Sequence, residues 1–188
     1  DVADAKLKSA EDKIKAKAQK YIYSIDEMDL EDVVGAMLTE QKLTIAVAES
    51  CTGGMIANRI TNVSGSSAYF NRAFVTYSDN SKTELISVPK ELIRAHGAVS
   101  REVAEAMAVG ARANAGVDIA LSTTGIAGPT GGTAEKPVGL VWIGYADANG
   151  AMALKFNFGE HRLRFKERAS QAALELLRRK LLKLHLRK

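Results

Sequence analysis

One short segment constrains the fold more than any other: an apolar, β-branched run at residues 44–48 that passes directly into an amphipathic helix. The run reads Thr-Ile-Ala-Val-Ala and is bounded by polar residues, which is typical of a strand buried on both faces. Met55, Ile56 and Ile60 then recur at helical spacing, so we predict a helix over residues 52–62. A buried strand that leads straight into a helix is the repeating unit of an α/β sheet.

The rest of the chain continues this alternation. We predict further strands at 73–77 and 118–122, and helices at 29–41, 80–86, from Pro89, and at 100–115. Residues 138–145 and 152–158 alternate around an Ala-Asn-Gly turn and predict an antiparallel hairpin, with a last helix over 164–188. The pattern therefore predicts an α/β fold: a three-layer α/β/α sandwich with a mixed, mainly parallel sheet and a C-terminal hairpin and helix.

The N-terminal segment has a different character. Residues 2–20 are rich in Ala and Lys and supply only a thin apolar stripe, so we predict a peripheral helix followed by a short extended piece at 21–25. We expect an N-terminal helical arm at 1–28 and one main domain at 29–188. Asp1 stands where an initiator Met would be, so we expect a fragment of a longer protein.

Composition narrows the class of protein. With 188 residues and 46% hydrophobic content the chain can bury one sizeable core. Its apolar runs are far shorter than the roughly 20 residues of a membrane-spanning helix, and no signal peptide is visible. A single cysteine, Cys51, excludes an internal disulfide and fits a reducing compartment, so we expect a cytoplasmic protein without membrane contact.

Positive charge is concentrated at the C-terminus. Residues 162–188 carry ten Lys or Arg and two Glu, whereas the whole chain has a formal charge of only +4. A basic helix can contact nucleic acid, but these charges alternate with Leu at helical spacing, and Phe165 is the one Phe, Tyr or Trp among them. A solvated helix face is the favoured interpretation, and we do not expect nucleic acid as a partner.

Ser50 is the first candidate for chemistry, because it lies where the first buried strand ends and the next helix begins. Unpaired backbone N–H groups at a helix start could hold an anion or a developing oxyanion, and Gly53 and Gly54 would let a ligand approach the backbone closely. From this segment alone an N-cap role for Ser50 is the favoured interpretation. Cys51 could act as a nucleophile at such a position, but small buried packing is the favoured interpretation.

A serine nucleophile needs a base, and Lys82 is a candidate. His96, His161 and His185 form no readable motif with Ser50. Lys82 is predicted in the first turn of a helix, where a cation opposes the helix dipole, so a neutral, partly desolvated amine assisted by the Tyr77 hydroxyl is one hypothesis. An ordinary surface lysine is the other.

A glycine-rich loop at 124–132 supplies a second candidate region. Its backbone N–H groups and the Thr124 hydroxyl could wrap a phosphate or ribose, or its glycines could merely form successive turns. It matches neither the P-loop nor the dinucleotide fingerprint. No His, Cys or acidic cluster has metal-ligand spacing, so we predict no metal and no cofactor.

Several motifs in a fixed order now identify a family. They are Ala-Glu-Ser-Cys-Thr-Gly-Gly at 48–54, Gly-Ser-Ser-Ala-Tyr-Phe at 65–70, Val-Thr-Tyr-Ser at 75–78 with Lys82, His-Gly-Ala-Val-Ser at 96–100, Thr-Gly-Ile-Ala-Gly-Pro at 124–129 with Gly131 and Gly132, and Lys-Pro-Val-Gly at 136–139. From about Leu30 onward this pattern closely resembles the C-terminal domain of the CinA family of competence/damage-inducible proteins.

The resemblance implies a nicotinamide-nucleotide amidase that hydrolyses the carboxamide of nicotinamide mononucleotide to nicotinate mononucleotide and ammonia, in pyridine-nucleotide recycling. Matched by motif, Ser50 is the nucleophile, Lys82 its base and Tyr77 an assisting hydroxyl. Substrate contacts are expected from Thr52, Gly53, Gly54, Thr124, Gly125, Gly128 and an arginine after Phe158-Gly159-Glu160, where Arg162 matches best and Arg164 stays open. The resemblance also implies a homodimer, and a missing N-terminal CinA domain joined through a linker whose tail resembles residues 5–23.

Two rivals remain at this point. One is a non-catalytic nucleotide- or DNA-associated module of a competence or damage response, which predicts salt-sensitive DNA binding. The other is an amidase for another substrate, which would retain Ser50 and Lys82.

Overall fold

The computed structural model describes residues 2–159 and 161–184. Five strands form one sheet, in the order β2-β1-β3-β4-β5. The strands are β1 (Ile45–Glu49), β2 (Phe70–Val75), β3 (Ile119–Gly125), β4 (Leu140–Asp147) and β5 (Gly150–Asn157). β1 pairs in parallel with β2 and β3, whereas the β3–β4 and β4–β5 pairs are antiparallel. Only β4 therefore runs against the other four, and the predicted mixed sheet and C-terminal hairpin are confirmed.

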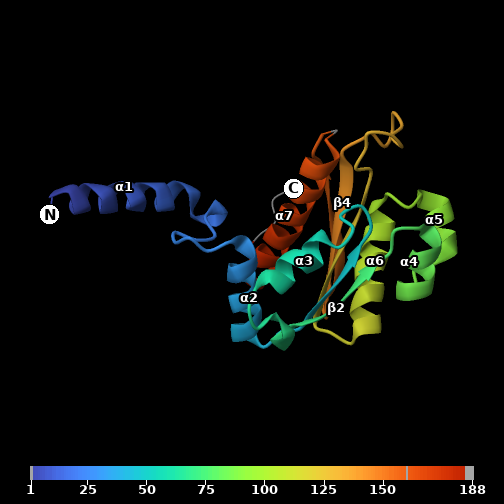
Figure 1. Ribbon diagram of the computed structural model, residues 1–188, viewed down its shortest axis with the longest axis horizontal. Helices are drawn as coiled ribbons and strands as arrows, with labels where there is room; N and C mark the ends of the chain where they lie inside the picture. Colours follow the sequence, from blue (N-terminus) through green and yellow to red (C-terminus); the bar gives the residue numbers. More distant parts are fainter. Residues whose placement is uncertain (1, 160, 185–188) are drawn as a thin grey trace.

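Helices cover both faces of this sheet (Figure 1). One face carries α2 (Leu30–Gln41), α3 (Met55–Asn62) and α7 (Arg162–Leu181), and the other carries α4 (Asp79–Ile86), α5 (Lys90–His96) and α6 (Arg101–Ala115). The two faces follow from the period of the strands: Ile45 and Val47 point into the α2/α3/α7 core, and Ala46 and Ala48 point the other way. The predicted three-layer α/β/α sandwich is confirmed.

Small residues bring the α6 layer close to its neighbours. A Cβ on Gly110 of α6 would overlap the carbonyl oxygen of Ile86, at the end of α4. A Cβ on Gly144 of β4 would overlap the Ser122 hydroxyl and lie 2.5 Å from the carbonyl oxygen of Ala104. This close packing holds α4, which carries Lys82, against the sheet.

Gly110→Ala is expected to destabilise the fold by about 2 kcal/mol, although Gly→Ala in a helix interior usually stabilises by roughly 1 kcal/mol. The reason is the overlap with the Ile86 carbonyl, which backbone atoms cannot relieve by changing rotamer. Urea unfolding measures the change, and Ala113→Gly on the exposed side of α6 calibrates the propensity effect. A Gly110→Ala protein as stable as the parent would contradict the packing argument.

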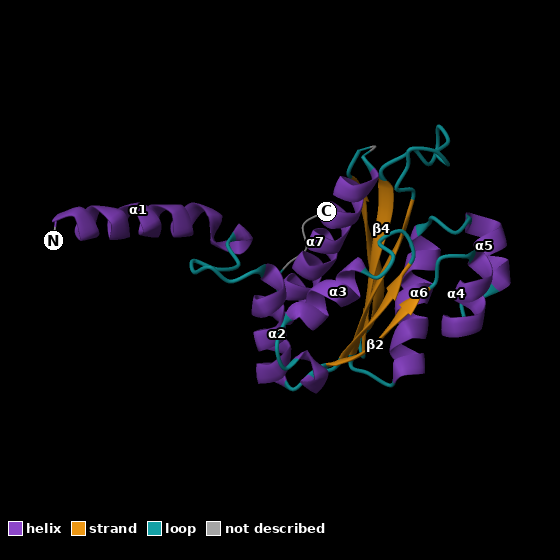
Figure 2. Cartoon of the chain, viewed as in Figure 1, coloured by secondary structure: helices purple, strands orange, loops and turns teal. Residues whose placement is uncertain are grey.

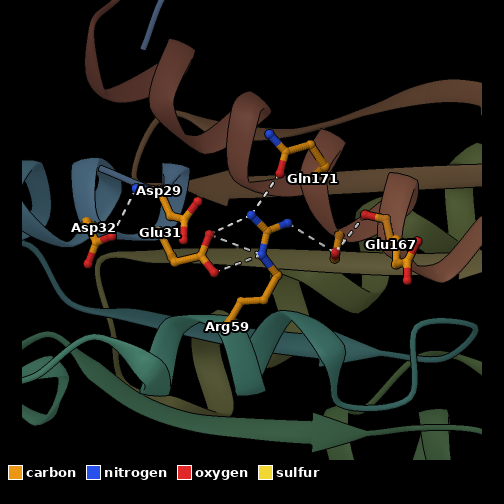
Figure 3. Close-up of polar contacts among 7 residues, drawn as sticks. Asp29, Glu31, Asp32, Arg59, Glu167 and Gln171 are labelled. Atoms are coloured by element: carbon orange, nitrogen blue, oxygen red, sulfur yellow. Dashed lines mark hydrogen bonds and ion pairs between the residues drawn. The ribbon is translucent and has the colours of Figure 1, made fainter. Parts of the chain in front are cut away.

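Three helices on the other face are joined by one arginine (Figure 3). Arg59 of α3 donates through its Nε and Nη2 to the Glu31 carboxylate of α2, and through Nη1 and Nη2 to Ser170 and Gln171 of α7. The side chains of Arg59 and Glu31 are 18% and 13% exposed, so this pair is shielded from solvent more than a typical surface ion pair. The network fixes α7 relative to α3, and so the start of α7 relative to the turn that precedes α3.

The N-terminal helix α1 (Val2–Ala18) extends away from the sandwich (Figure 2), and none of its residues is buried. A 3₁₀ turn (Gln19–Tyr21) follows it. Residues 22–25 of the piece predicted as extended have no regular secondary structure, and among the described strands none pairs with them. No helix among the described residues is long and apolar enough to cross a bilayer.

Several predicted boundaries were wrong by a few residues. The helix predicted at 52–62 begins only at Met55, β2 spans Phe70–Val75 instead of 73–77, and β3 continues to Gly125. The last helix begins at Arg162, two residues earlier than predicted, and it ends at Leu181, so the prediction that it continues through 184 was wrong. The rest of its predicted range, 185–188 with His185, lies outside the described residues, as does Glu160. The lengths of β2 and β3 depend on their pairing with β1 and β4. Local composition carries no signal for that pairing.

Candidate active site

Ser50 lies immediately after β1, at the carboxyl end of the parallel strands. Its backbone N–H donates to the carbonyl of Thr123 on β3 at 3.0 Å, and the residue is 8% exposed. The chain then turns through Gly53 and Gly54, whose φ angles of +59° and +92° lie in the left-handed region and delay the start of α3. Ser50 therefore stands in a tight turn before the helix.

The Glu49 carboxylate caps α3 from inside the protein. This fully buried side chain accepts from the backbone N–H groups of Gly54, Ile56 and Ala57 at 3.0, 3.1 and 2.9 Å. The sequence-based expectation that helix-start N–H groups are available to an anion therefore fails for these three groups, because a carboxylate of the chain already occupies them. Within the described residues, the N–H groups of the turn without an acceptor in another residue are those of Cys51 and Thr52.

Three predicted substrate contacts lie away from the cavity beside Ser50. Thr52 is fully buried, and its hydroxyl shares a 2.7 Å hydrogen bond with the Thr123 hydroxyl. Gly53 and Gly54 shape the turn but do not line the cavity. These residues position Ser50 instead of lining the space in front of it.

A cavity of about 280 Å³ brings the other candidates together. Residues from the ends of β1 and β3, from the start of α4 and from the start of α7 all face it. Its lining includes these residues singled out from the sequence: Ser50, Tyr77, Lys82, Thr124, Gly125, Gly128 and Arg162. Residues separated by more than a hundred positions thus share one space, whose volume is close to the lower end of the range of small-molecule sites.

Lys82 is among the largest fully buried side chains in the described part of the molecule, at 1% exposed. Its Nζ donates to the carbonyl oxygens of Thr76 and Ser78 at 3.1 and 3.3 Å, and lies 3.6 Å from Oδ1 of Asp79. Burial lowers the pKa of Lys82 below its usual value, and the Asp79 carboxylate partly offsets that effect. Such an amine reaches its neutral form more readily than a surface lysine.

Tyr77 and Arg162 both line the cavity and are hydrogen-bonded to each other. Because β2 ends at Val75, Tyr77 lies beyond the strand and is 61% exposed. Its hydroxyl accepts from Nη2 of Arg162 at 2.8 Å, and Nη1 of Arg162 donates to the Gly128 carbonyl at 2.9 Å. Arg162 lines the cavity, and Arg164 is not among the residues that do.

Thr124 belongs to a strand and not to the predicted loop. It is the penultimate residue of β3, 1% exposed, and its hydroxyl donates to the Ala98 carbonyl at 2.7 Å. Gly125 follows where β4 passes so closely that a Cβ would lie 2.6 Å from the Leu140 carbonyl oxygen. The glycine-rich segment therefore begins its irregular path one residue after Gly125, with Gly128, Thr130 and Gly131 along the cavity.

Cys51 also lines the cavity but has the properties of a packing residue. It is 6% exposed and belongs to the main core cluster. Burial raises the pKa of its thiol to about 12, so the thiolate needed for nucleophilic attack is scarce at neutral pH.

Sequence reasoning missed two charged residues of this site, Glu49 and Asp79. Glu49 lies within the 48–54 motif, but the sequence alone assigned it no function. Its carboxylate reaches the start of α3 because the turn after β1 directs the chain back toward it, and the sequence does not show that geometry. Asp79 stands three residues before Lys82, a spacing that places two side chains on the same helix face and could have signalled the pair.

Known proteins match the part of the chain that forms the sandwich and the cavity. The sequence profile described as "CinA C-terminal domain" matches residues 27–181. A CinA-like protein of Citrifermentans bemidjiense is 51% identical over 176 residues, covering 94% of this chain and 42% of the relative, and a CinA-like protein of Chloroherpeton thalassium is 51% identical over 171 residues, covering 89% and 41%. The chain thus spans less than half the length of these curated relatives.

Solved structures agree with the fold. The crystal structure of the competence/damage inducible protein CihA from Agrobacterium tumefaciens matches with a TM-score of 0.78 and 38% identity, covering 85% of this chain and 99% of that one. A competence-damaged protein (CinA) superfamily protein from Klebsiella pneumoniae matches with a TM-score of 0.79 and 30% identity, covering 82% and 96%.

Proposed function

The chain belongs to the CinA C-terminal domain family, and from that premise we propose that it is an amidohydrolase that converts nicotinamide mononucleotide to nicotinate mononucleotide and ammonia. The observation that carries the proposal is the buried Lys82 facing the same cavity as Ser50. An otherwise unactivated serine requires such a base, and a desolvated lysine can serve as one.

The proposed reaction proceeds in two stages. Neutral Lys82 accepts the Ser50 hydroxyl proton as Oγ attacks the carboxamide carbon, and the resulting ammonium protonates the leaving nitrogen as the C–N bond breaks. Ammonia departs and an acyl-serine remains. Water then attacks this ester, Lys82 takes the water proton, and that proton returns to Ser50 as nicotinate mononucleotide leaves.

Other residues would stabilise and hold the substrate. The backbone N–H group of Cys51, which lines the cavity, is proposed to receive the oxyanion, in place of the helix-start groups that Glu49 occupies. Arg162 has five N–H donors and uses one for Tyr77 and one for Gly128, so donors remain for a substrate phosphate. Thr124, Gly125 and Gly128 line the cavity and would contact the bound nucleotide.

One assay tests the reaction class and phosphate recognition together. The purified chain is incubated with nicotinamide mononucleotide and released ammonia is followed, with nicotinamide riboside as the phosphate-free control. Saturable release that favours the mononucleotide supports the proposal. Faster turnover of simple amides would favour an amidase for another substrate.

Arg162→Gln is expected to raise KM for nicotinamide mononucleotide by about 10- to 100-fold, because a charge-assisted bond to phosphate contributes roughly 1.5–3 kcal/mol. KM for the riboside should change much less. Arg164→Gln is the matched control, since Arg164 does not line the cavity. An equal change in KM for both substrates in Arg162→Gln would show that Arg162 does not recognise the phosphate.

The DNA-associated alternative receives less support from the fold. Arg178 is buried, and Arg178 and Arg179 both pair with Glu175 within α7. Part of the basic charge of this helix is thereby neutralised inside the chain. Salt-sensitive DNA binding without ammonia release would reverse this preference.

A further inference from the structure

Asp79 is an exposed acid in a position that no motif explains. It is the first residue of α4 and lines the same cavity as Ser50 and Lys82. Its carboxylate lies 3.6 Å from Nζ of Lys82, across one turn of the helix. An acid at a helix start is common because it opposes the helix dipole, so the pair with Lys82 must be argued separately.

The surroundings of Lys82 supply that argument. Its two hydrogen-bond acceptors, the carbonyls of Thr76 and Ser78, are neutral. The other charged or titratable side chains at this cavity are Cys51 after β1, Tyr77 before α4 and Arg162 at the start of α7. Arg162 is a cation and the Cys51 thiol is protonated at neutral pH, so among the described residues at the cavity only Asp79 supplies negative charge to a Lys82 ammonium.

We propose that Asp79 is a positioning residue for the amide hydrolysis, whose carboxylate lets the buried Lys82 hold the proton that it carries from Ser50 to the leaving ammonia. This inference rests on the proposed function. Burial and Asp79 have opposite effects on Lys82. Burial favours the neutral amine, which can act as a base, whereas the Asp79 carboxylate stabilises the ammonium that forms when Lys82 accepts the proton. Without Asp79 the amine would be neutral more often but poorer at accepting the serine proton.

The test is the pH dependence of kcat/KM for nicotinamide mononucleotide. In Asp79→Asn the acidic limb should move to lower pH by roughly 0.5 unit, because this partly exposed pair raises the pKa of Lys82 only modestly. The maximal kcat should fall several-fold, and Asp79→Glu should restore both in part. Glu84→Gln is the matched control, since it removes the same charge from the exposed side of α4, where Glu84 bonds Asn80.

A second measurement separates this inference from the proposed function. In protein labelled with ¹³C at the lysine ε-carbon, the Lys82 resonance is assigned by its loss in Lys82→Gln and titrated by NMR with no substrate present. A lower Lys82 pKa in Asp79→Asn but not in Glu84→Gln supports the pairing even if no amide is hydrolysed. An unchanged Lys82 titration, or an unchanged acidic limb in an active enzyme, overturns the inference.

Discussion

Ser50→Ala is expected to reduce kcat/KM for nicotinamide mononucleotide by at least about 10³-fold, since removal of a serine nucleophile leaves only the catalysis supplied by binding and oxyanion contacts. The fold should survive. Among the described contacts, the interactions of Ser50 are made by its backbone, including the bond to the Thr123 carbonyl, and these remain in alanine. Ammonia release measured under saturating substrate gives the loss.

Two further variants show whether the loss is specific. Ser67→Ala makes the same chemical change at an exposed serine away from the cavity and should leave the rate unchanged. Cys51→Ala tests the rival nucleophile, and an alanine there should retain substantial turnover because the thiol is protonated and buried. Full, substrate-saturable activity in Ser50→Ala would reject the serine mechanism. Loss of activity in Cys51→Ala but not in Ser50→Ala would identify the Cys51 thiol as the nucleophile.

Glu49→Ala is expected to lower the free energy of unfolding by about 3 kcal/mol. The substitution leaves the N–H groups of Gly54, Ile56 and Ala57 without their acceptor, and each buried donor left unpaired costs roughly 1–3 kcal/mol. Gly54 and Ala57 are only partly buried, so water can replace part of what is lost. Urea unfolding followed by circular dichroism measures the change.

The control for this prediction is Glu40→Ala on the exposed end of α2, which should change stability by less than about 0.5 kcal/mol. Activity provides a second readout, because the turn that carries Ser50 depends on the same three hydrogen bonds. A Glu49→Ala protein with unchanged stability would mean that the cap contributes little and that glycine conformation alone sets the turn.

The order and type of most elements could be predicted from periodicity. The apolar run around Val47 and the alternating hairpin strands carry their signal locally, so the sandwich and the mixed sheet followed from them. The exact ends of the helices and strands could not be predicted in this way. β2 is an edge strand whose length is set by pairing with β1, and the helix after Ser50 starts late because Gly53 and Gly54 take left-handed backbone angles.

By itself the sequence determined the layers of the fold and, through ordered motifs, the family to which the chain belongs. It also marked Ser50, Lys82 and Tyr77 as candidates. Only the tertiary structure decided that these side chains share a cavity with Arg162, that Glu49 faces α3, and that Lys82 is buried beside Asp79. The physical reason is range: periodicity and capping act over a few residues, whereas burial, hydrogen-bond partners and pKa values depend on atoms that distant segments bring together.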